Sequence, residues 1–194
     1  MSAWQQRQQL QQALARQPGD FIAWVMLADV ELEAGDIAAG EQAARRALQL
    51  RPNHPDAPAR LGRVAWMADA HADAATLLGQ ASALAPEHPG IALWLGHALE
   101  DADDAEGAAA AYRRAHALLP GEPYIAAQRL AWQRRLCDWQ DLDALAAQVR
   151  AAVAAGQGVV EPFAFLSEDA SAAEQRACAR MRAAAVAGAV RPLP

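Results

Sequence analysis

The sequence repeats itself with a period of 34 residues, and this period constrains the fold more than any other feature. Four prolines, four alanines and three leucines recur at this interval within a single phase. They are Pro18, Pro52, Pro86 and Pro120; Ala13, Ala47, Ala81 and Ala115; and Leu27, Leu61 and Leu95. Regular recurrence at 20 to 50 residues indicates a protein built from stacked structural repeats.

Each unit is predicted to be a helix–turn–helix hairpin. In residues 21–51, apolar positions recur at helical spacing, Asp20 and Asp36 are suited to cap two helices, and Gly35 separates them. A single hairpin cannot bury its own apolar face, so successive units must stack. The predicted fold is an all-α, right-handed solenoid of helical hairpins with irregular helices at the C-terminal end.

The unit resembles the tetratricopeptide repeat, which is a pair of helices with this period. The resemblance rests on W-x-x-L-A in Trp24–Ala28, followed by Ala47 and Pro52, and most closely on LWLGHALEDADDAEGAAAAYRRAHALLP in residues 93–120. The predicted organisation is a capping helix in 1–20, three repeats in 21–122, a degenerate fourth hairpin in 123–156, and a linker loop with a final helix in 157–194.

Composition disfavours several classes of protein. The formal charge of −6 and the pI near 5.3 argue against a nucleic-acid partner. Two cysteines, Cys137 and Cys178, form no disulfide framework and have no metal-ligand spacing, which favours a reducing, cytoplasmic compartment. No apolar run reaches the ~20 residues that a membrane-spanning helix needs, so no membrane contact is expected.

No motif in the chain predicts chemistry. The sequence has no phosphate-binding loop, no Ser-His-Asp or Cys-His arrangement, and no histidine with a ligand partner at metal spacing. The acidic run EDADDAE in residues 100–106 fits helix capping by Asp103 or Asp104 better than cation binding. We therefore expect no catalytic residue, no metal and no cofactor in these residues.

The first helix of each repeat should line a concave face where a partner protein or peptide binds. The predicted groove residues are Asp29, Arg60, Arg63, Trp66, Trp94, His97 and Arg135. Two interpretations are open for the equivalent positions Asp29 and Arg63. The arginine could pair with a partner's carboxylate beside Trp94, or the two residues could bridge one another across consecutive repeats.

The stretch LCDWQDLDAL in residues 136–145 interrupts the period. Asp138 is expected to cap a long helix that reaches about Ala155, with Trp139 facing back onto the preceding hairpin and Cys137 as a small core residue. Ser171 and Glu174 predict a capping box at the start of a final helix.

The loop VVEPFAFL in residues 159–166 concentrates apolar side chains. They could pack locally on the last hairpin or form an interface with another domain. The residues predicted to dock another domain are Trp139, Val160, Phe163 and Phe165.

The order R-R-L-C-D-W (134–139), V-E-P-F-A-F-L (160–166) and E-Q-R-A-C-A-R (174–180) resembles a junction in another family. It is similar to the segment that joins repeats to catalytic domain in bacterial O-linked N-acetylglucosamine transferases and SPINDLY proteins. The resemblance implies a substrate-presenting region whose catalytic domain binds in cis or in trans. UDP-N-acetylglucosamine would then be a donor only for the catalytic lobes, and no catalytic residue carries over. The alternative is a stand-alone adaptor that binds a partner peptide in its groove.

Overall fold

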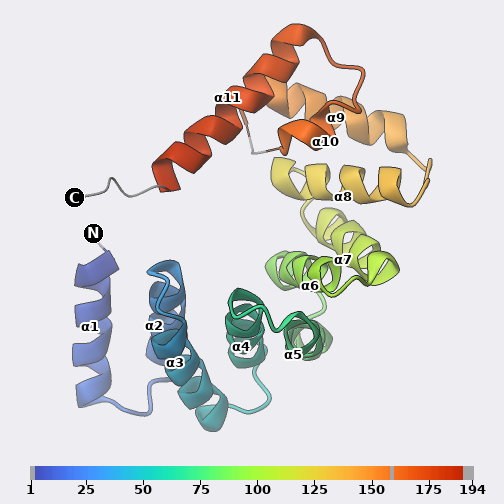
Figure 1. Cartoon of the computed structure of the whole chain (residues 1–194). Helices are drawn as coiled ribbons and strands as arrows, with labels where there is room; N and C mark the ends of the chain where they lie inside the picture. Colours follow the sequence, from blue (N-terminus) through green and yellow to red (C-terminus); the bar gives the residue numbers. More distant parts are fainter. Residues whose placement is uncertain (1–2, 158–159, 190–194) are drawn as a thin grey trace. The chain divides into compact units, whose positions relative to one another are not determined.

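The computed structural model describes residues 3–157 and 160–189, which form eleven helices and no strand (Figure 1). A single helix, α1 (Ala3–Arg16), precedes four hairpins, and two further helices follow them. The hairpins are α2 (Phe21–Glu33) with α3 (Ile37–Leu50), α4 (Asp56–Met67) with α5 (His71–Leu84), α6 (Pro89–Asp101) with α7 (Ala105–Leu118), and α8 (Pro123–Arg135) with α9 (Leu142–Ala154). The last two helices are α10 (Pro162–Phe165) and α11 (Ala172–Ala189). The predicted all-α class is confirmed.

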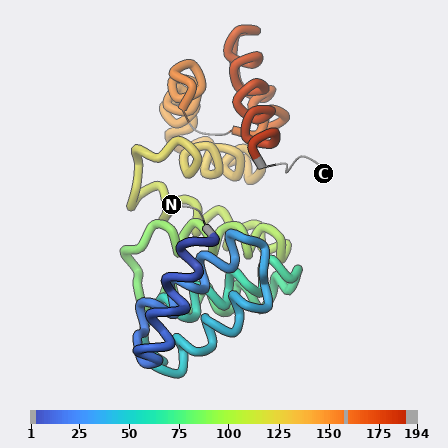
Figure 2. Tube along the Cα trace, turned by 90° about the vertical axis from the view of Figure 1, so that its left-hand side faces the viewer, coloured from blue at the N-terminus to red at the C-terminus, as the bar shows by residue number. Residues whose placement is uncertain are grey.

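The chain divides into two compact units, residues 1–111 and 112–194, with the boundary inside α7. In the first unit each helix packs on the next, from α1 through α6 (Figure 2). This sequential stacking buries one face of every hairpin and gives the first unit the form of an α solenoid.

The turn inside each of the four hairpins begins with the same geometry. One residue per turn takes a left-handed backbone conformation, and the next backbone N–H donates to the carbonyl five residues earlier, as in a helix-ending Schellman motif. The left-handed residues are Gly35, Asp69, Asp103 and Cys137, with φ of 81°, 58°, 60° and 54°. They are 34 positions apart, so the repeat persists in backbone geometry as far as Cys137.

Side-chain caps begin several helices as predicted. Asp20 and Asp36 each accept a hydrogen bond of 3.0 Å from a backbone N–H three residues on. Asp104, and not Asp103, caps α7 by accepting from the Gly107 N–H at 2.9 Å. Ser171 and Glu174 form the predicted capping box, in which each side chain accepts from the other's backbone N–H.

Small residues let the helices of the first unit approach closely. Ala47 and Ala81 are completely buried, and a Cβ atom added at Gly62 would lie only 2.6 Å from Leu78 Cγ. A side chain at Gly62 would force Leu78 to move within a packed core. Ala47 and Ala81, two of the recurring alanines of the sequence, therefore lie where helices contact one another.

The predicted structure of residues 136–141 is wrong in three respects. Asp138 does not cap a helix, because α9 begins only at Leu142, after a second left-handed residue at Asp141. Asp138 instead accepts from the Gln140 N–H at 3.1 Å and from Arg113 at 3.3 Å. Cys137 is exposed, and the Trp139 side chain is 67% exposed. Both residues precede α9, so neither belongs to its buried face.

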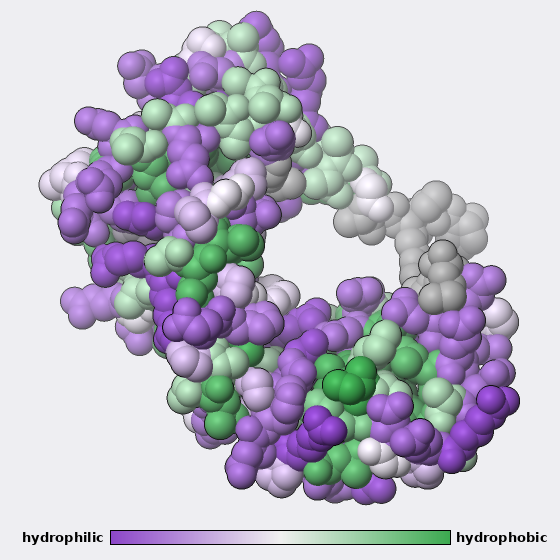
Figure 3. Space-filling view, turned by 180° about the vertical axis from the view of Figure 1, so that it is seen from behind, coloured by the Kyte–Doolittle hydropathy of each residue, from purple (hydrophilic) through white to green (hydrophobic). Residues whose placement is uncertain are grey.

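The second unit has its own apolar core, built from α8, α9, α10 and α11. Its buried residues include Leu130, Val149, Val160, Phe165 and Cys178. Burial raises the pKa of the Cys178 thiol, and the charge of Glu161 adds to this effect. In the distal half of α11, the residues from Ala183 to Gly188 are exposed. Figure 3 shows weakly hydrophobic residues, in pale green, next to the grey C-terminal atoms.

Candidate functional site

The first helices of the three repeats carry matched polar and aromatic side chains on one face, which we call the inner face. Its residues are Met26, Asp29 and Glu33 of α2; Arg60, Arg63, Trp66 and Met67 of α4; and Trp94, His97 and Asp101 of α6. Each helix contributes equivalent positions because the 34-residue period repeats the same helical phase.

Asp29 joins two consecutive repeats through both arginines of α4. Its carboxylate accepts from an Arg60 terminal nitrogen and from an Arg63 terminal nitrogen, each at 2.8 Å. Arg60 also donates to Asp56 at 2.8 Å. The interpretation that Asp29 and Arg63 bridge neighbouring repeats is confirmed, and the same carboxylate engages Arg60 as well.

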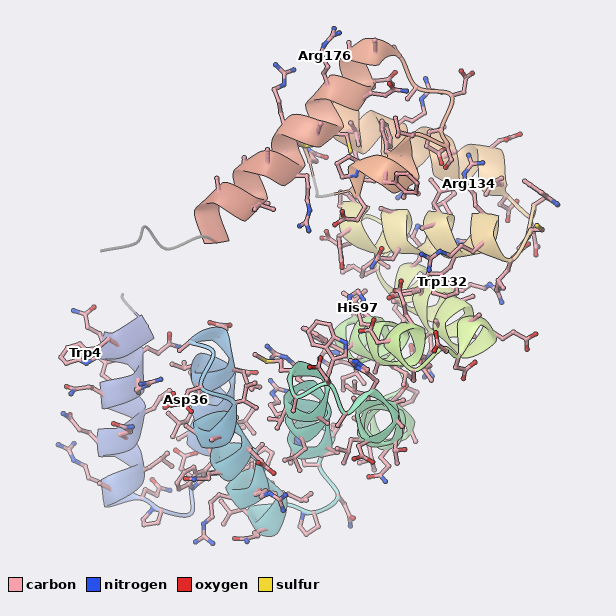
Figure 4. The ribbon with its side chains drawn as sticks, viewed as in Figure 1. Trp4, Asp36, His97, Trp132, Arg134 and Arg176 are labelled. Carbon is pink, nitrogen blue, oxygen red and sulfur yellow. The ribbon has the colours of Figure 1, made fainter. Side chains whose placement is uncertain are left out.

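Aromatic contacts continue this network into the third repeat. The Arg63 guanidinium lies 4.9 Å from the centre of the Trp94 ring, and Trp94 meets Trp66 edge to face at 5.2 Å between ring centres. His97 contacts Trp94 at 5.6 Å (Figure 4). The Trp66 indole N–H donates to Asp101 at 2.6 Å. A continuous series of contacts therefore runs from α2 through α4 to the end of α6.

Two opposing effects act on the pKa of His97. Burial lowers its pKa, the negative charges of Glu100 and Asp101 raise it, and the net effect is a lowered pKa. The folded protein therefore binds a proton at His97 less readily than the unfolded chain does.

We expect His97 to make folding stability sensitive to acid. Because the unfolded state protonates first, the contribution of His97 to stability is fully present above the ordinary histidine pKa of about 6.5. It is lost as pH falls from that value through the lowered pKa of the folded state. Urea unfolding at pH 7 and pH 5 should show a smaller loss of stability for His97→Gln than for the natural protein. Equal losses in the two proteins would contradict the prediction. His116 of the second unit, whose pKa burial and Arg129 also lower, is present in both proteins and contributes equally.

Negative charge dominates the first unit. Residues 1–111 contain fifteen carboxylates and seven arginines, whereas residues 112–194 contain eight carboxylates and ten arginines. Between Arg63 and Arg113 there are eight carboxylates and no arginine, and the whole chain has no lysine. Within this acidic stretch, Trp66, Met67, Asp69, His71 and Asp101 line an open depression of about 470 Å³.

The remaining predicted site residues lie in the second unit. Arg135 is exposed and stacks on the Trp132 ring at 4.8 Å. The prediction that Val160 and Phe165 form a docking surface is wrong, because both are buried in the core of this unit. Phe163 is on the surface, with 88% of its area exposed. Val159, part of the same apolar loop, lies outside the described residues.

A feature that sequence reasoning missed is the ion pair between Arg134 and Glu168. Two nitrogens of Arg134 donate to the two carboxylate oxygens of Glu168 at 2.7 and 2.8 Å. The hydrogen bonds to Glu168 raise the pKa of Arg134, although burial opposes them. Arg134 enters the sequence analysis only in the motif R-R-L-C-D-W, and no sequence signal indicates that Glu168, 34 residues later, is its partner.

Within residues 3–157 and 160–189, no three His, Cys, Asp or Glu side chains gather as ligands would. No helix of this part combines the length and apolar character that crossing a membrane requires.

Comparison with known proteins identifies the repeat. The tetratricopeptide repeat model matches residues 7–58 and 59–123, which is more than half of the chain. No curated protein sequence matches.

Solved structures share the fold at low sequence identity. A fragment of MamA from Desulfovibrio magneticus RS-1 is 21% identical, with a TM-score of 0.62 over 79% of this chain and 96% of that one. A double mutant of MamA RS-1 is also 21% identical, with a TM-score of 0.66 over 79% and 86%. A thermophilic TPR protein from Thermus thermophilus is 17% identical, with a TM-score of 0.63 over 93% and 89%. The chain belongs to the tetratricopeptide repeat family.

Proposed function

We propose that this protein is a stand-alone adaptor whose first unit binds a basic segment of a partner protein along the inner face. Tetratricopeptide arrays use such extended concave surfaces for binding. The observation that carries the proposal is the combination of partly exposed aromatic rings with an excess of carboxylates beside them.

The charge balance of the inner face favours a basic partner. Arg60 and Arg63 are already paired with Asp29, so they offer little to a partner's carboxylate. Beside Trp66, Asp69 and Asp101 line the depression, and neither an arginine nor a lysine is among its lining residues. A cation over an indole ring gains electrostatic attraction, and neighbouring carboxylates add to it.

The proposal is tested first by locating the partner. A photoreactive residue at Met26, which is 43% exposed on the inner face, should crosslink to a partner protein in the native cells. The matched control places the same residue at Gln49, exposed on the second helix of that hairpin. If the residue at Met26 captures only proteins that the residue at Gln49 also captures, the adaptor function is contradicted.

The basic character of the partner is tested by removing charge from the depression. The double variant Asp69→Asn and Asp101→Asn should weaken binding of the captured partner by about fivefold. Asparagine tolerates the left-handed backbone at position 69 and still accepts the Trp66 hydrogen bond at position 101. The double variant Glu87→Gln and Glu106→Gln removes the same charge elsewhere in the unit and should leave affinity unchanged. Equal affinities for both double variants would contradict basic recognition.

A second candidate is the substrate-presenting region of an O-linked N-acetylglucosamine transferase-like protein. The motif order in residues 134–180 and the exposed Phe163 favour it. It predicts that the chain alone does not bind UDP-N-acetylglucosamine and that it docks catalytic lobes supplied in trans. Absence of docking at high micromolar concentration would contradict this candidate and leave the adaptor proposal standing.

A further inference from the structure

Helix α11 carries a basic side that faces away from the core of the second unit. Its opposite side contributes Cys178 to that core. Arg176 and Arg180 are exposed and lie four residues apart, so they share one side of the helix. Ala183 and Ala187 are also exposed and continue the same side toward the end of the helix. We call these two arginines and two alanines the arginine side.

Both arginines of the arginine side are available to a partner. The one carboxylate of α11, Glu174, is engaged by the capping box and by Arg150 at 3.4 Å. In the part of the chain that the structure describes, neither Arg176 nor Arg180 pairs with a carboxylate. Two solvated guanidinium groups one helical turn apart attract a surface that carries carboxylates.

The first unit carries a surface of complementary charge and shape. In the depression beside Trp66, Asp69 and Asp101 are both exposed. The three arginines and single carboxylate of α11 give this helix a charge of +2, whereas the seven arginines and fifteen carboxylates of the first unit give −8. A guanidinium group can stack on an indole ring and at the same time donate hydrogen bonds to a neighbouring carboxylate.

We propose that the arginine side of α11 binds the depression beside Trp66 on a second copy of the chain. The inference rests on the proposed basic-segment site and names one occupant of it. Charge complementarity selects this occupant, because every copy that offers the acidic depression also offers an exposed basic helix. The contact joins two different surfaces, so it links copies head to tail. A basic segment of another protein would compete with the second copy for the same carboxylates.

Sedimentation velocity of the full chain tests for this association. The average mass should rise above the 20.6 kDa of one chain as concentration increases, and high salt should reverse the rise because it screens exposed charges. Arg176→Ala with Arg180→Ala should weaken association by about tenfold. The control Ala147→Glu with Ala151→Glu changes the net charge equally on an exposed side of α9 and should leave association unchanged. A natural chain that stays monomeric up to high micromolar concentration, or equal association of the two double variants, would overturn the proposal.

A mixing experiment identifies the two surfaces that meet. The double variant Asp69→Asn and Asp101→Asn keeps the arginine side and removes the charge of the depression, whereas Arg176→Ala with Arg180→Ala does the reverse. Each should be monomeric alone, and an equimolar mixture should form dimers and nothing larger, because each pair retains one intact contact. Circular dichroism melting verifies that both variants are folded. A mixture that stays monomeric would overturn the proposal.

The self-association and the adaptor function fail separately. A chain that is monomeric at every concentration rules out a second copy as the occupant of the depression. Capture of another protein by the photoreactive residue at Met26 would still support the adaptor function in that case. Conversely, a chain that associates through α11 but captures no other protein at Met26 would retain the self-association and contradict the adaptor function.

Discussion

Replacing Phe165 by alanine should lower the free energy of unfolding of the second unit by about 3–5 kcal/mol. The side chain is almost fully buried against Leu130, Val149 and Cys178, and truncation of a buried phenylalanine removes apolar burial and leaves a cavity. Cys178 is a built-in reporter, because its thiol belongs to the same core and reacts with a thiol reagent only when that core opens. Labelling of Cys178 should therefore become at least a hundredfold faster in Phe165→Ala.

The control is Phe163→Ala, two residues earlier in the same short helix. Because Phe163 is exposed, its truncation should change stability by less than about 0.5 kcal/mol and leave the labelling rate of Cys178 unchanged. Cys137 is exposed and should react quickly in every variant. Equal effects of the two truncations would show that α10 does not hold the core closed.

The periodic part of the fold could be predicted because several independent signals agree in one phase. The caps Asp20 and Asp36, the buried alanines and the bridge from Asp29 to Arg63 all follow from one 34-residue register. Any error in that register would move every apolar residue off the buried face, so few alternatives survive.

The second unit could not be predicted to the same depth, because its period ends after Cys137. Each of the first three hairpins has three residues between its helices, whereas six separate α8 from α9. No sequence signal determines at which residue of D-W-Q-D the helix begins. The sequence therefore could not determine whether the Trp139 side chain is buried or exposed. Likewise, α10 is one turn long, and a single turn has no periodicity to distinguish Phe163 from Phe165.

The sequence could predict which residues share a face, but not which of them pair with one another. Helical phase placed Trp66, Trp94 and His97 on one face, and the structure brings their rings together. Phase could not show that Asp29 also pairs with Arg60, so that both arginines are engaged where they had suggested a carboxylate receptor. It also could not connect Arg134 with Glu168, because a contact between a helix and an irregular segment has no sequence period.

Removing the carboxylate of Asp29, which joins the first two repeats, should cause the second large loss of folding stability. Asp29→Ala leaves Arg60 and Arg63, whose side chains are about four-fifths buried, close together without their shared partner. Loss of one member of a largely buried ionic network leaves uncompensated charge, and partial solvent access moderates the cost to about 2 kcal/mol. Urea unfolding of the whole chain measures it. Glu33→Ala, one turn further along the same face and exposed, should change stability by less than about 0.5 kcal/mol.

A double-mutant cycle separates the bridge from the general cost of truncation. If Asp29 and Arg63 act together, the variant lacking both should be more stable than the sum of the single changes predicts, by about 1 kcal/mol. The double variant relieves the repulsion between the two arginines, while Arg60 keeps its contact with Asp56. Strict additivity would mean that the contact between Asp29 and Arg63 adds nothing to stability. A positive coupling would show that the inner face also contributes to stability. It would also mean that the arginines which a carboxylate ligand would need are already engaged in joining the repeats.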